Sequence, residues 1–243
     1  MLKKLIILGN GPGLNNVDFR RVRDSGVPVL GMNRISELFY NETTWPLTHY
    51  LNVTDNTVNI KSWEKSARFA IKATPLSILS REVASHLQLT GLENSVIIDV
   101  DFGGHARRYN DVNPASIVWR QSGPYDKYGS SAHVAFQWAS RELFTRIYLL
   151  GFDLNFKEQP LITRVLRRLN INFFFNDKNH FSSTYGTPGL KAKDLNRNML
   201  SMHAISMLNF HRLGIDVVKI NTGGDLTLYK WQEVEDFYRE ISC

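Results

Sequence analysis

The sequence predicts an α/β fold with a single Rossmann-like, doubly wound and mainly parallel sheet. Two observations predict it. Short apolar runs alternate along the chain with segments in which apolar residues recur at the 3.6-residue period of an amphipathic helix. Several of the short runs are apolar at nearly every position, which is typical of parallel strands covered by helices on both faces. Because strands and helices alternate in this way, we expect one doubly wound sheet.

Seven apolar runs are predicted strands, and three periodic segments are predicted helices. The strands are Leu5–Leu8, Val27–Gly31, His49–Val53, Ala67–Ala73, Ser95–Val100, Arg146–Leu150 and Asp216–Ile220. The helices are Leu76–Leu89, Ser131–Phe144 and Asp194–Arg212. The first strand follows a lysine pair, as the apolar part of a signal peptide does, but its run is too short and passes into a glycine-rich turn. We therefore interpret it as a buried strand.

The chain shows no sign of a second domain. It contains no internal repeat and no Ser/Gly-rich linker. Two irregular regions, Gly103–Gly129 and Glu158–Leu190, interrupt the pattern. Long excursions inside a compact domain are usually functional lids or disordered segments. We expect one domain over residues 1–243, with a lid-like insertion over about residues 157–190.

Charge and cysteine content restrict the partners and the compartment. The chain has 29 basic and 23 acidic residues, and a charge of +6 suggests anionic partners such as nucleotide phosphates, acidic glycans, nucleic acid or a membrane surface, without choosing among them. Cys243 is the single cysteine, so neither an internal disulfide nor a cysteine metal cluster is expected. No apolar stretch reaches the roughly 18 residues of a membrane span. We expect a cytoplasmic protein; peripheral association with the inner face of the membrane and self-association stay open.

The first predicted strand ends in a glycine-rich turn, Gly9-Asn10-Gly11-Pro12-Gly13-Leu14. Such a turn lets the backbone approach a phosphate, whose charge a following helix N-terminus favours. It is not a complete dinucleotide fingerprint, because Leu14 stands where the third glycine belongs, and it is not a P-loop. The alternative is an ordinary tight turn between a strand and a helix.

Asparagines follow the first three predicted strands. They are Asn10, Asn33 and Asn52. An amide offers donors and an acceptor without charge, so it can hold phosphate oxygens and sugar hydroxyls. Each alone would more often be a turn or cap residue. Because the strand ends of an α/β sheet meet at one crevice, together they favour a ligand site.

Two later segments offer further candidates. Ser130 and Ser131 precede a predicted helix, where either is a natural N-cap, or could present a hydroxyl to a ligand carboxylate or phosphate. Gly151-Phe152-Asp153 follows the strand Arg146–Leu150. Asp153 could hold a ribose or a base edge, or could cap the next turn.

The most distinctive segment is Asn176–Phe181, which contains His180 and is followed by Tyr185. A loop histidine with a pKa near ~6.5 is suited to proton transfer, although a structural histidine is an equal alternative. Three arginines precede this segment: Arg164, Arg167 and Arg168. They could form a solvated helix face or an anion-attracting lid. No His-x-x-x-His pair or carboxylate cluster suggests a metal site.

In this order the motifs resemble those of the bacterial sialyltransferases of glycosyltransferase family 42, and more distantly the pterin diphosphokinase-like group. The matching segments are Gly9–Gly13, Met32-Asn33, Leu51-Asn52, Ser130–Ala132, Ile147–Asp153 and Asn176–Phe181. They cover most of the chain in short islands. The resemblance implies a GT-A-like variant of the doubly wound fold and a single nucleotide-sugar-binding catalytic domain.

The resemblance also implies roles for particular residues. His180 would deprotonate the acceptor hydroxyl. The cytidine monophosphate part of the donor would be held by Asn10, Asn33 and Asp153, with Gly11, Gly151 and Phe152 in the matching motifs. Asn52 and Ser131, beside Ser130, would contact the donor sugar. Because a nucleoside monophosphate is already a fair leaving group, neutral donors could suffice, with no cofactor beyond the CMP-sugar co-substrate.

The chain departs from the family pattern at two positions. Asn155 stands where the family has a tyrosine that supports the leaving phosphate, and Tyr128 replaces an arginine. A second tyrosine of the family that supports the leaving phosphate has no clear counterpart in this sequence, although Tyr185 could be a spatial substitute for it. Transfer of a CMP-activated sugar is therefore better supported than sialic acid as that sugar.

The leading hypothesis is a metal-independent, inverting glycosyltransferase that transfers a sugar from a CMP-sugar, CMP-sialic acid foremost, to a glycan of a bacterial surface polysaccharide or lipooligosaccharide. The first alternative is a Mg²⁺-dependent, pterin diphosphokinase-like enzyme that uses ATP, for which Asp99 and Asp101 could supply carboxylates. The second is a nucleotide-binding module without catalysis. Nucleic-acid binding is not expected, because no basic aromatic stripe or known motif occurs.

Overall fold

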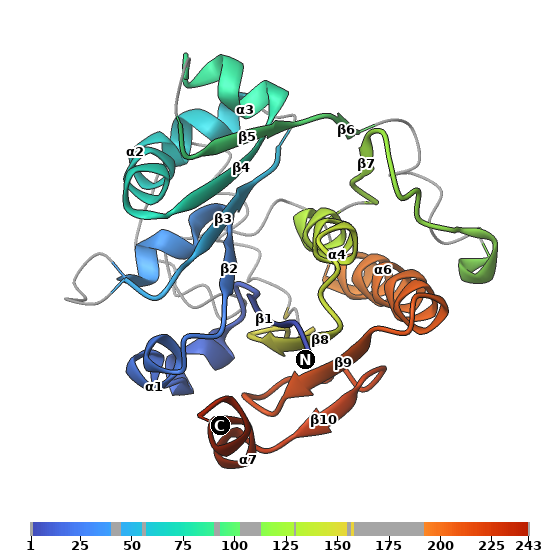
Figure 1. Ribbon diagram of the computed structural model, residues 1–243. Helices are drawn as coiled ribbons and strands as arrows, with labels where there is room; N and C mark the ends of the chain where they lie inside the picture. The colour runs from blue at the N-terminus through green and yellow to red at the C-terminus, as the bar shows by residue number, and fades with distance from the viewer. Residues whose placement is uncertain are drawn as a thin grey trace.

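An eight-stranded sheet forms the centre of the protein (Figure 1). The computed structural model describes residues 2–39, 45–54, 57–89, 93–102, 113–128, 130–154, 157 and 192–242. The strands are β1 (Lys4–Leu8), β2 (Val29–Met32), β3 (His49–Asn52), β4 (Leu76–Ser80), β5 (Ser95–Ile98), β8 (Arg146–Leu150), β9 (Asp216–Ile220) and β10 (Lys230–Gln232). Their order is β10-β9-β8-β1-β2-β3-β4-β5, and every pairing is parallel. The predicted α/β fold with a doubly wound parallel sheet is confirmed. A separate parallel pair, β6 (Val100–Asp101) and β7 (Tyr125–Asp126), lies beside it.

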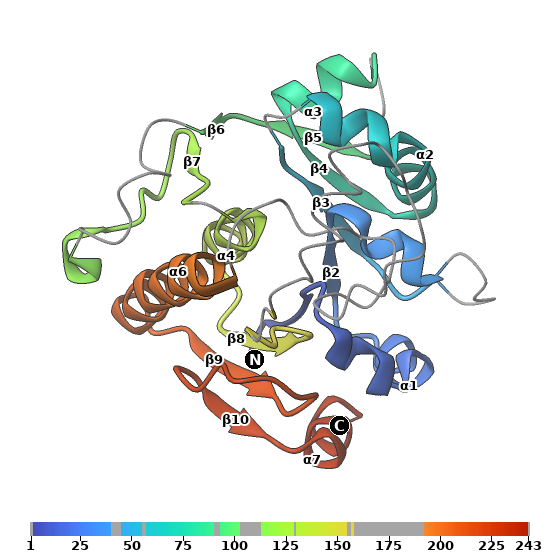
Figure 2. The ribbon, with the colours of Figure 1, turned by 180° about the vertical axis from the view of Figure 1, so that it is seen from behind.

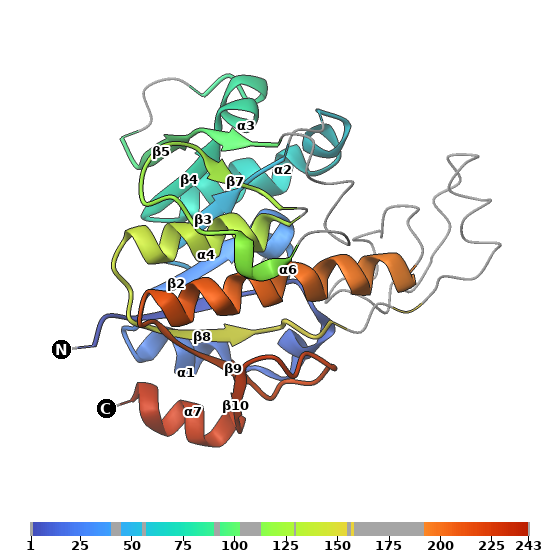
Figure 3. The ribbon, with the colours of Figure 1, turned by 90° about the vertical axis from the view of Figure 1, so that its right-hand side faces the viewer.

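Helices cover both faces of the sheet. They are α1 (Phe19–Asp24), α2 (Thr57–Ala73), α3 (Arg81–His86), α4 (Ser131–Arg141), α6 (Ala192–Arg212) and α7 (Val234–Ile241), with 3₁₀ helices η1 (Pro12–Asn16), η2 (Asn33–Phe39) and η5 (Pro114–Ser116). One core lies under α4 and α6, and a second lies under α1, α2, α3 and α7. Figure 2 shows α4 and α6 side by side, and Figure 3 shows both in front of the sheet.

The central strand β1 shows why the strand sequences are apolar throughout. Leu5 and Ile7 belong to the core under α4 and α6, whereas Ile6 and Leu8 belong to the core on the opposite face. All four are completely buried. Because successive side chains of a strand point to opposite faces, a strand covered on both sides needs apolar residues at every position.

Two element predictions in the second quarter of the chain are wrong. Residues Ala67–Ala73 form the end of helix α2, and the predicted helix Leu76–Leu89 begins as strand β4 and is helical only in α3. The buried residues of the first segment are Ala67, Ala70 and Ile71, at helical spacing, whereas β4 is buried at nearly every position. The helical spacing of the apolar residues was present in the sequence, but a short apolar run does not by itself distinguish a strand from a helix.

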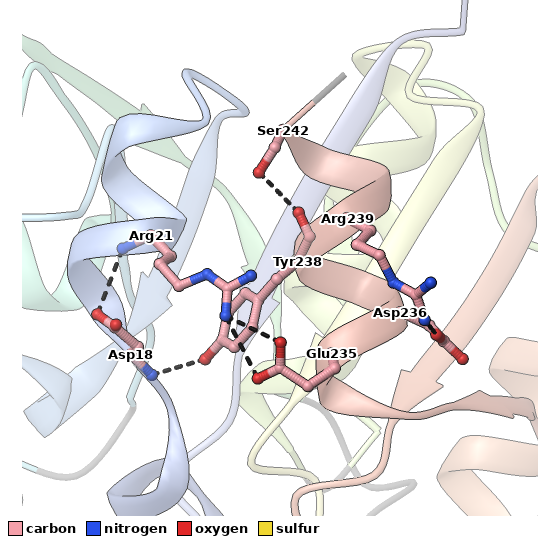
Figure 4. A network of polar contacts seen from close by, with 7 residues as sticks. All are labelled: Asp18, Arg21, Glu235, Asp236, Tyr238, Arg239 and Ser242. Atoms are coloured by element: carbon pink, nitrogen blue, oxygen red, sulfur yellow. Dashed lines mark hydrogen bonds and ion pairs between the residues drawn. The ribbon is translucent and has the colours of Figure 1, made fainter.

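The sequence patterns did not predict the short elements α1, β10 and α7. Polar contacts join the α1 segment to α7 (Figure 4). The Asp18 side chain caps α1, and its backbone N–H donates to the Tyr238 hydroxyl at 2.6 Å. The Arg21 guanidinium lies 4.0 Å from the centre of the Tyr238 ring and donates to Glu235 at 3.0 Å. These contacts hold α7 against the segment that follows the glycine-rich turn.

Among the described residues, no helix is both long and apolar enough to cross a membrane. The predicted lid over residues 157–190 falls almost wholly outside the described residues and stays a prediction.

Candidate functional site

The carboxyl ends of four adjacent strands, β8, β1, β2 and β3, carry most of the residues that the sequence singles out. From β1 the chain continues to β2 on one side, and from the neighbouring β8 it continues to β9 on the other. In doubly wound sheets, ligands bind outside the strand carboxyl ends at such a reversal. With strands about 4.8 Å apart, the edge from β8 to β3 extends over about 14 Å. This length suits a ligand made of two or three linked groups.

The glycines after β1 are required by another loop of the same protein. The N–H of Gly11 donates to the carbonyl of Gly151 at 2.9 Å. A Cβ on Gly11 would lie 2.3 Å from Asp153 Oδ2, and one on Gly13 would lie 2.8 Å from Asp153 Oδ1. No side chain fits at such distances. A tight turn packed on residues 151–153 therefore explains these glycines without a bound phosphate.

The segment after this turn also differs from a phosphate-binding motif. Pro12–Asn16 forms a five-residue 3₁₀ helix, and α1 begins only at Phe19. No long helix starts directly at the turn, so the expected stabilisation of a phosphate by a helix N-terminus has no basis there.

Asp153 places a buried carboxylate after β8, at one end of this edge. It is 7% exposed, and its Oδ2 accepts the Gly13 N–H at 2.7 Å. Its Oδ1 is buried and has no hydrogen-bond partner among the described residues. Burial raises the pKa of Asp153, whereas the Gly13 N–H and the positive charge of Lys219 lower it. An acceptor left without a donor in this way costs free energy until a donor reaches it.

A second group of polar residues joins β2, β3 and α4. Asn33 follows β2 in the left-handed region (φ 52°), which asparagine tolerates better than most residues. Its Nδ2 donates to Ser131 Oγ at 3.0 Å, and Ser131 Oγ donates to the carbonyl of Val53 at 3.0 Å. The Asn33 Oδ1 accepts the Val53 N–H at 3.3 Å. The structure therefore brings the predicted Asn33 and Ser131 into direct contact.

Asn52, the last residue of β3, is completely buried beside this group. Its Nδ2 donates to the Tyr50 hydroxyl at 2.9 Å, and that hydroxyl donates to the Asn33 carbonyl at 2.6 Å. The Asn52 Oδ1 has no hydrogen-bond partner among the described residues. Asn52 and Asp153 thus each present an unused acceptor oxygen, at the ends of β3 and β8.

Two predicted site residues have structural roles. Ser130 is the N-cap of α4, where its side chain accepts the Ala132 N–H at 3.2 Å. Phe152 is 6% exposed and packs against the rings of Phe136 and His203 inside the core. Asn10 lies in the turn after β1, half-buried. His180 and Tyr185 lie outside the described residues, as do Asn155 and the three arginines of the predicted lid.

Sequence reasoning missed two residues of this region. Tyr50 joins the Asn33 and Asn52 amides, but a tyrosine within an apolar strand gives no sign of that role. Lys219 is different, because a lysine inside the run Val217-Val218-Lys219-Ile220 is an unusual charge in a strand buried on both faces. That anomaly could have identified it.

The carboxylates considered for Mg²⁺ lie elsewhere. Asp99 follows the edge strand β5 and forms an ion pair with Arg81 at 2.7 Å. Within the described ranges, no group of three or more His, Cys, Asp or Glu side chains could hold a metal ion.

Comparisons with known proteins show a distant structural similarity. No family model and no curated protein matches the chain. Two solved structures are similar over 90% of this chain and 81% of theirs. One is the sialyltransferase CstII from Campylobacter jejuni with the substrate analogue CMP-3FNeuAc, at 13% identity and a TM-score of 0.40. The other is a variant of the sialyltransferase Cst-II with CMP, at 16% identity and a TM-score of 0.44. The ligands are those of the two solved proteins.

Proposed function

We propose that this protein is a glycosyltransferase that uses a CMP-activated sugar as donor. One observation carries the proposal: two buried acceptor oxygens, Asn52 Oδ1 and Asp153 Oδ1, have no partner among the described residues and lie at the carboxyl edge of the sheet. Sugar and ribose hydroxyls are donors that would satisfy both oxygens. The order of the motifs along the chain, which resembles family 42, supports the same conclusion.

In this proposal the two groups of residues divide the donor between them. Asp153 and Asn10, after β8 and β1, hold the cytidine monophosphate. Asn52 and Ser131, near β3 and the start of α4, contact the sugar. Asn33 keeps a second amide hydrogen after bonding to Ser131 and can donate it to the ligand. The span of about 14 Å leaves room for a nucleotide and a sugar side by side.

The chemistry follows from the donor. An acceptor hydroxyl oxygen attacks the anomeric carbon while His180 takes its proton. The bond from that carbon to the phosphate oxygen breaks, and CMP leaves with the electron pair. One displacement inverts the configuration. CMP-sialic acid is the first donor to test, and a bacterial surface glycan is the proposed acceptor.

The first experiment is a binding measurement by calorimetry with CMP and ATP, each with Mg²⁺ and with EDTA. We expect CMP to bind equally well in both conditions. Tight binding of ATP that requires Mg²⁺, without CMP binding, would overturn the proposal in favour of the pterin diphosphokinase-like alternative. Asn52→Ala should weaken donor binding, whereas Asn113→Ala, at an exposed 3₁₀ cap, is the matched control.

The second experiment tests the base. His180→Ala should leave CMP binding intact and abolish sugar transfer from CMP-sialic acid to a mixture of oligosaccharide acceptors. Transfer at a rate near that of the wild type would show that another group takes the proton. CMP binding with neither transfer nor donor hydrolysis in the wild type would support the nucleotide-binding module instead.

A further inference from the structure

Lys219 is a buried charge in an otherwise apolar strand. Only 4% of the residue is exposed, and its neighbours Val218 and Ile220 belong to the core on the opposite face of the sheet. Lysine is almost never fully buried unless it is paired, because an ammonium without compensation is costly away from water. Its environment must therefore supply negative charge or acceptors.

The Lys219 ammonium reaches the loop that follows its own strand. Its Nζ donates to the carbonyl of Gly223 at 2.8 Å. The next residues of that loop lie directly on Asp153: the Asp225 N–H donates to the Asp153 carbonyl at 2.7 Å, and a Cβ on Gly224 would lie 2.0 Å from the same oxygen. Lys219 therefore stabilises, through a hydrogen bond, the loop of residues 222–225 that is packed against Asp153.

Among the described residues, few charges act on the Asp153 carboxylate. β9 and its loop contribute Lys219 and Asp225, and from α6 His203 contacts the ring of the adjacent Phe152. The described part of the glycine-rich turn, residues 9–14, has no titratable side chain. Burial lowers the pKa of Lys219, and the negative charges of Asp153 and Asp225 raise it. Lys219 is thus the one cation found to act on Asp153 among the described residues.

We propose that Lys219 is a positioning residue of the candidate site, which supplies the positive charge that balances the buried Asp153 carboxylate and holds the loop of residues 222–225 against it. This charge favours the ionised form of Asp153 and opposes the effect of burial on its pKa. Its Oδ2 then holds the glycine-rich turn and its Oδ1 can accept a hydroxyl of the nucleotide. The role toward the nucleotide rests on the proposed function; the role toward Asp153 does not.

A titration of the carboxylate tests the proposal without a ligand. The Asp153 side-chain carbon is followed by NMR from pH 3 to 8 in the wild type and in Lys219→Met, assigned with Asp153→Asn. Without the ammonium, the carboxyl should take up its proton at a higher pH, by at least about one pH unit. Lys219→Gln, which can still donate a hydrogen bond, is the second variant should the methionine variant not fold. Unchanged titration in a folded variant overturns the proposal.

The CMP affinity between pH 5 and 8 tests the consequence for binding. Loss of the cation should reduce affinity mainly on the acid side, by about tenfold for one unit of pKa change. Lys219→Arg should restore the wild-type profile, and Lys230→Met, an exposed lysine of the neighbouring strand β10, should leave it unchanged. An equal loss at all pH values indicates a merely structural role and overturns the proposal. Absence of CMP binding in the wild type contradicts the proposed function, whereas the titration still decides the role of Lys219.

Discussion

Individual residues at the carboxyl edge of the sheet combine structural bonds with unused hydrogen-bonding capacity. Ser131 bonds to both Asn33 and the Val53 carbonyl, so these polar residues stabilise the fold even without a ligand. Asn52 and Asp153 each use one polar group in the fold and leave one buried oxygen. Gly11 and Gly13 allow the turn after β1 to approach the loop of residues 151–153 closely. Of these two, Gly11 leaves less room for a Cβ beside Asp153.

Gly11→Ala should destabilise the protein by at least about 2 kcal/mol and abolish nucleotide binding, because the added Cβ would overlap Asp153 Oδ2 and the Gly151 carbonyl. Gly123→Ala is the control. Gly123 has a φ of 81° but no neighbour within 4 Å of an added Cβ, so it should cost only about 1 kcal/mol and leave binding unchanged. Urea unfolding and calorimetry measure the two effects. Equal destabilisation by the two variants would contradict the packing argument.

At the scale of secondary-structure elements, the end of helix α4 and the contacts between α1 and α7 affect the free energy of unfolding. Helix α4 is followed by Leu143 in the left-handed region (φ 60°), with 74% of the residue exposed. Glycine is usual at such a position, and a leucine there strains the backbone without burying its side chain. The pair α1–α7 depends instead on polar contacts.

Leu143→Gly should stabilise the protein by about 0.5–1 kcal/mol, because the strain of the left-handed leucine is relieved. Leu213→Gly is the matched control, since Leu213 is also an exposed leucine at a helix end but lacks a positive φ. It should be neutral or destabilising. The midpoint of urea unfolding distinguishes the two, and a loss of stability in Leu143→Gly would refute the prediction.

Tyr238→Phe should cost about 1 kcal/mol, because the phenylalanine keeps the ring under Arg21 but no longer accepts the Asp18 N–H. Glu235→Gln, which changes only an exposed ion pair, should cost a few tenths of a kcal/mol or nothing. Both are measured by urea unfolding. A smaller effect of Tyr238→Phe than of Glu235→Gln would mean that the hydroxyl does not hold the two helices together.

At the scale of the whole molecule, the buried histidines of α4 and α6 connect stability to pH. His133 accepts the Trp119 indole N–H at 3.0 Å and lies 3.0 Å from the Ser206 hydroxyl, and His203 contacts the Tyr229 hydroxyl at 3.1 Å. Burial lowers the pKa of both histidines to about 3. They stay neutral in the folded protein at pH values where the unfolded chain binds protons.

The free energy of unfolding should therefore fall as the pH decreases from about 6.5 toward 3, because only the unfolded state gains protons there. Each histidine contributes about 1.4 kcal/mol per pH unit well below pH 6.5. His203→Gln should reduce the proton uptake on unfolding by about one, measured from the slope of unfolding free energy against pH. A slope equal to that of the wild type would contradict the prediction.

The sequence by itself determined the sheet class, most of its strands and the polar residues at the strand ends. Apolar runs such as Leu5–Leu8 indicate strands that are buried on both faces of the sheet. The asparagines at strand ends could be recognised because each stands next to its strand in the sequence. Only the tertiary structure decided which residues meet. Gly11 and Asp153, like Asn33 and Ser131, are far apart in sequence. The pairing of β1 with β8 brings the first pair together, and the packing of α4 against β2 and β3 brings the second pair together. The role proposed for Lys219 depends on the tertiary structure in the same way, because Asp153 lies on the loop of another strand.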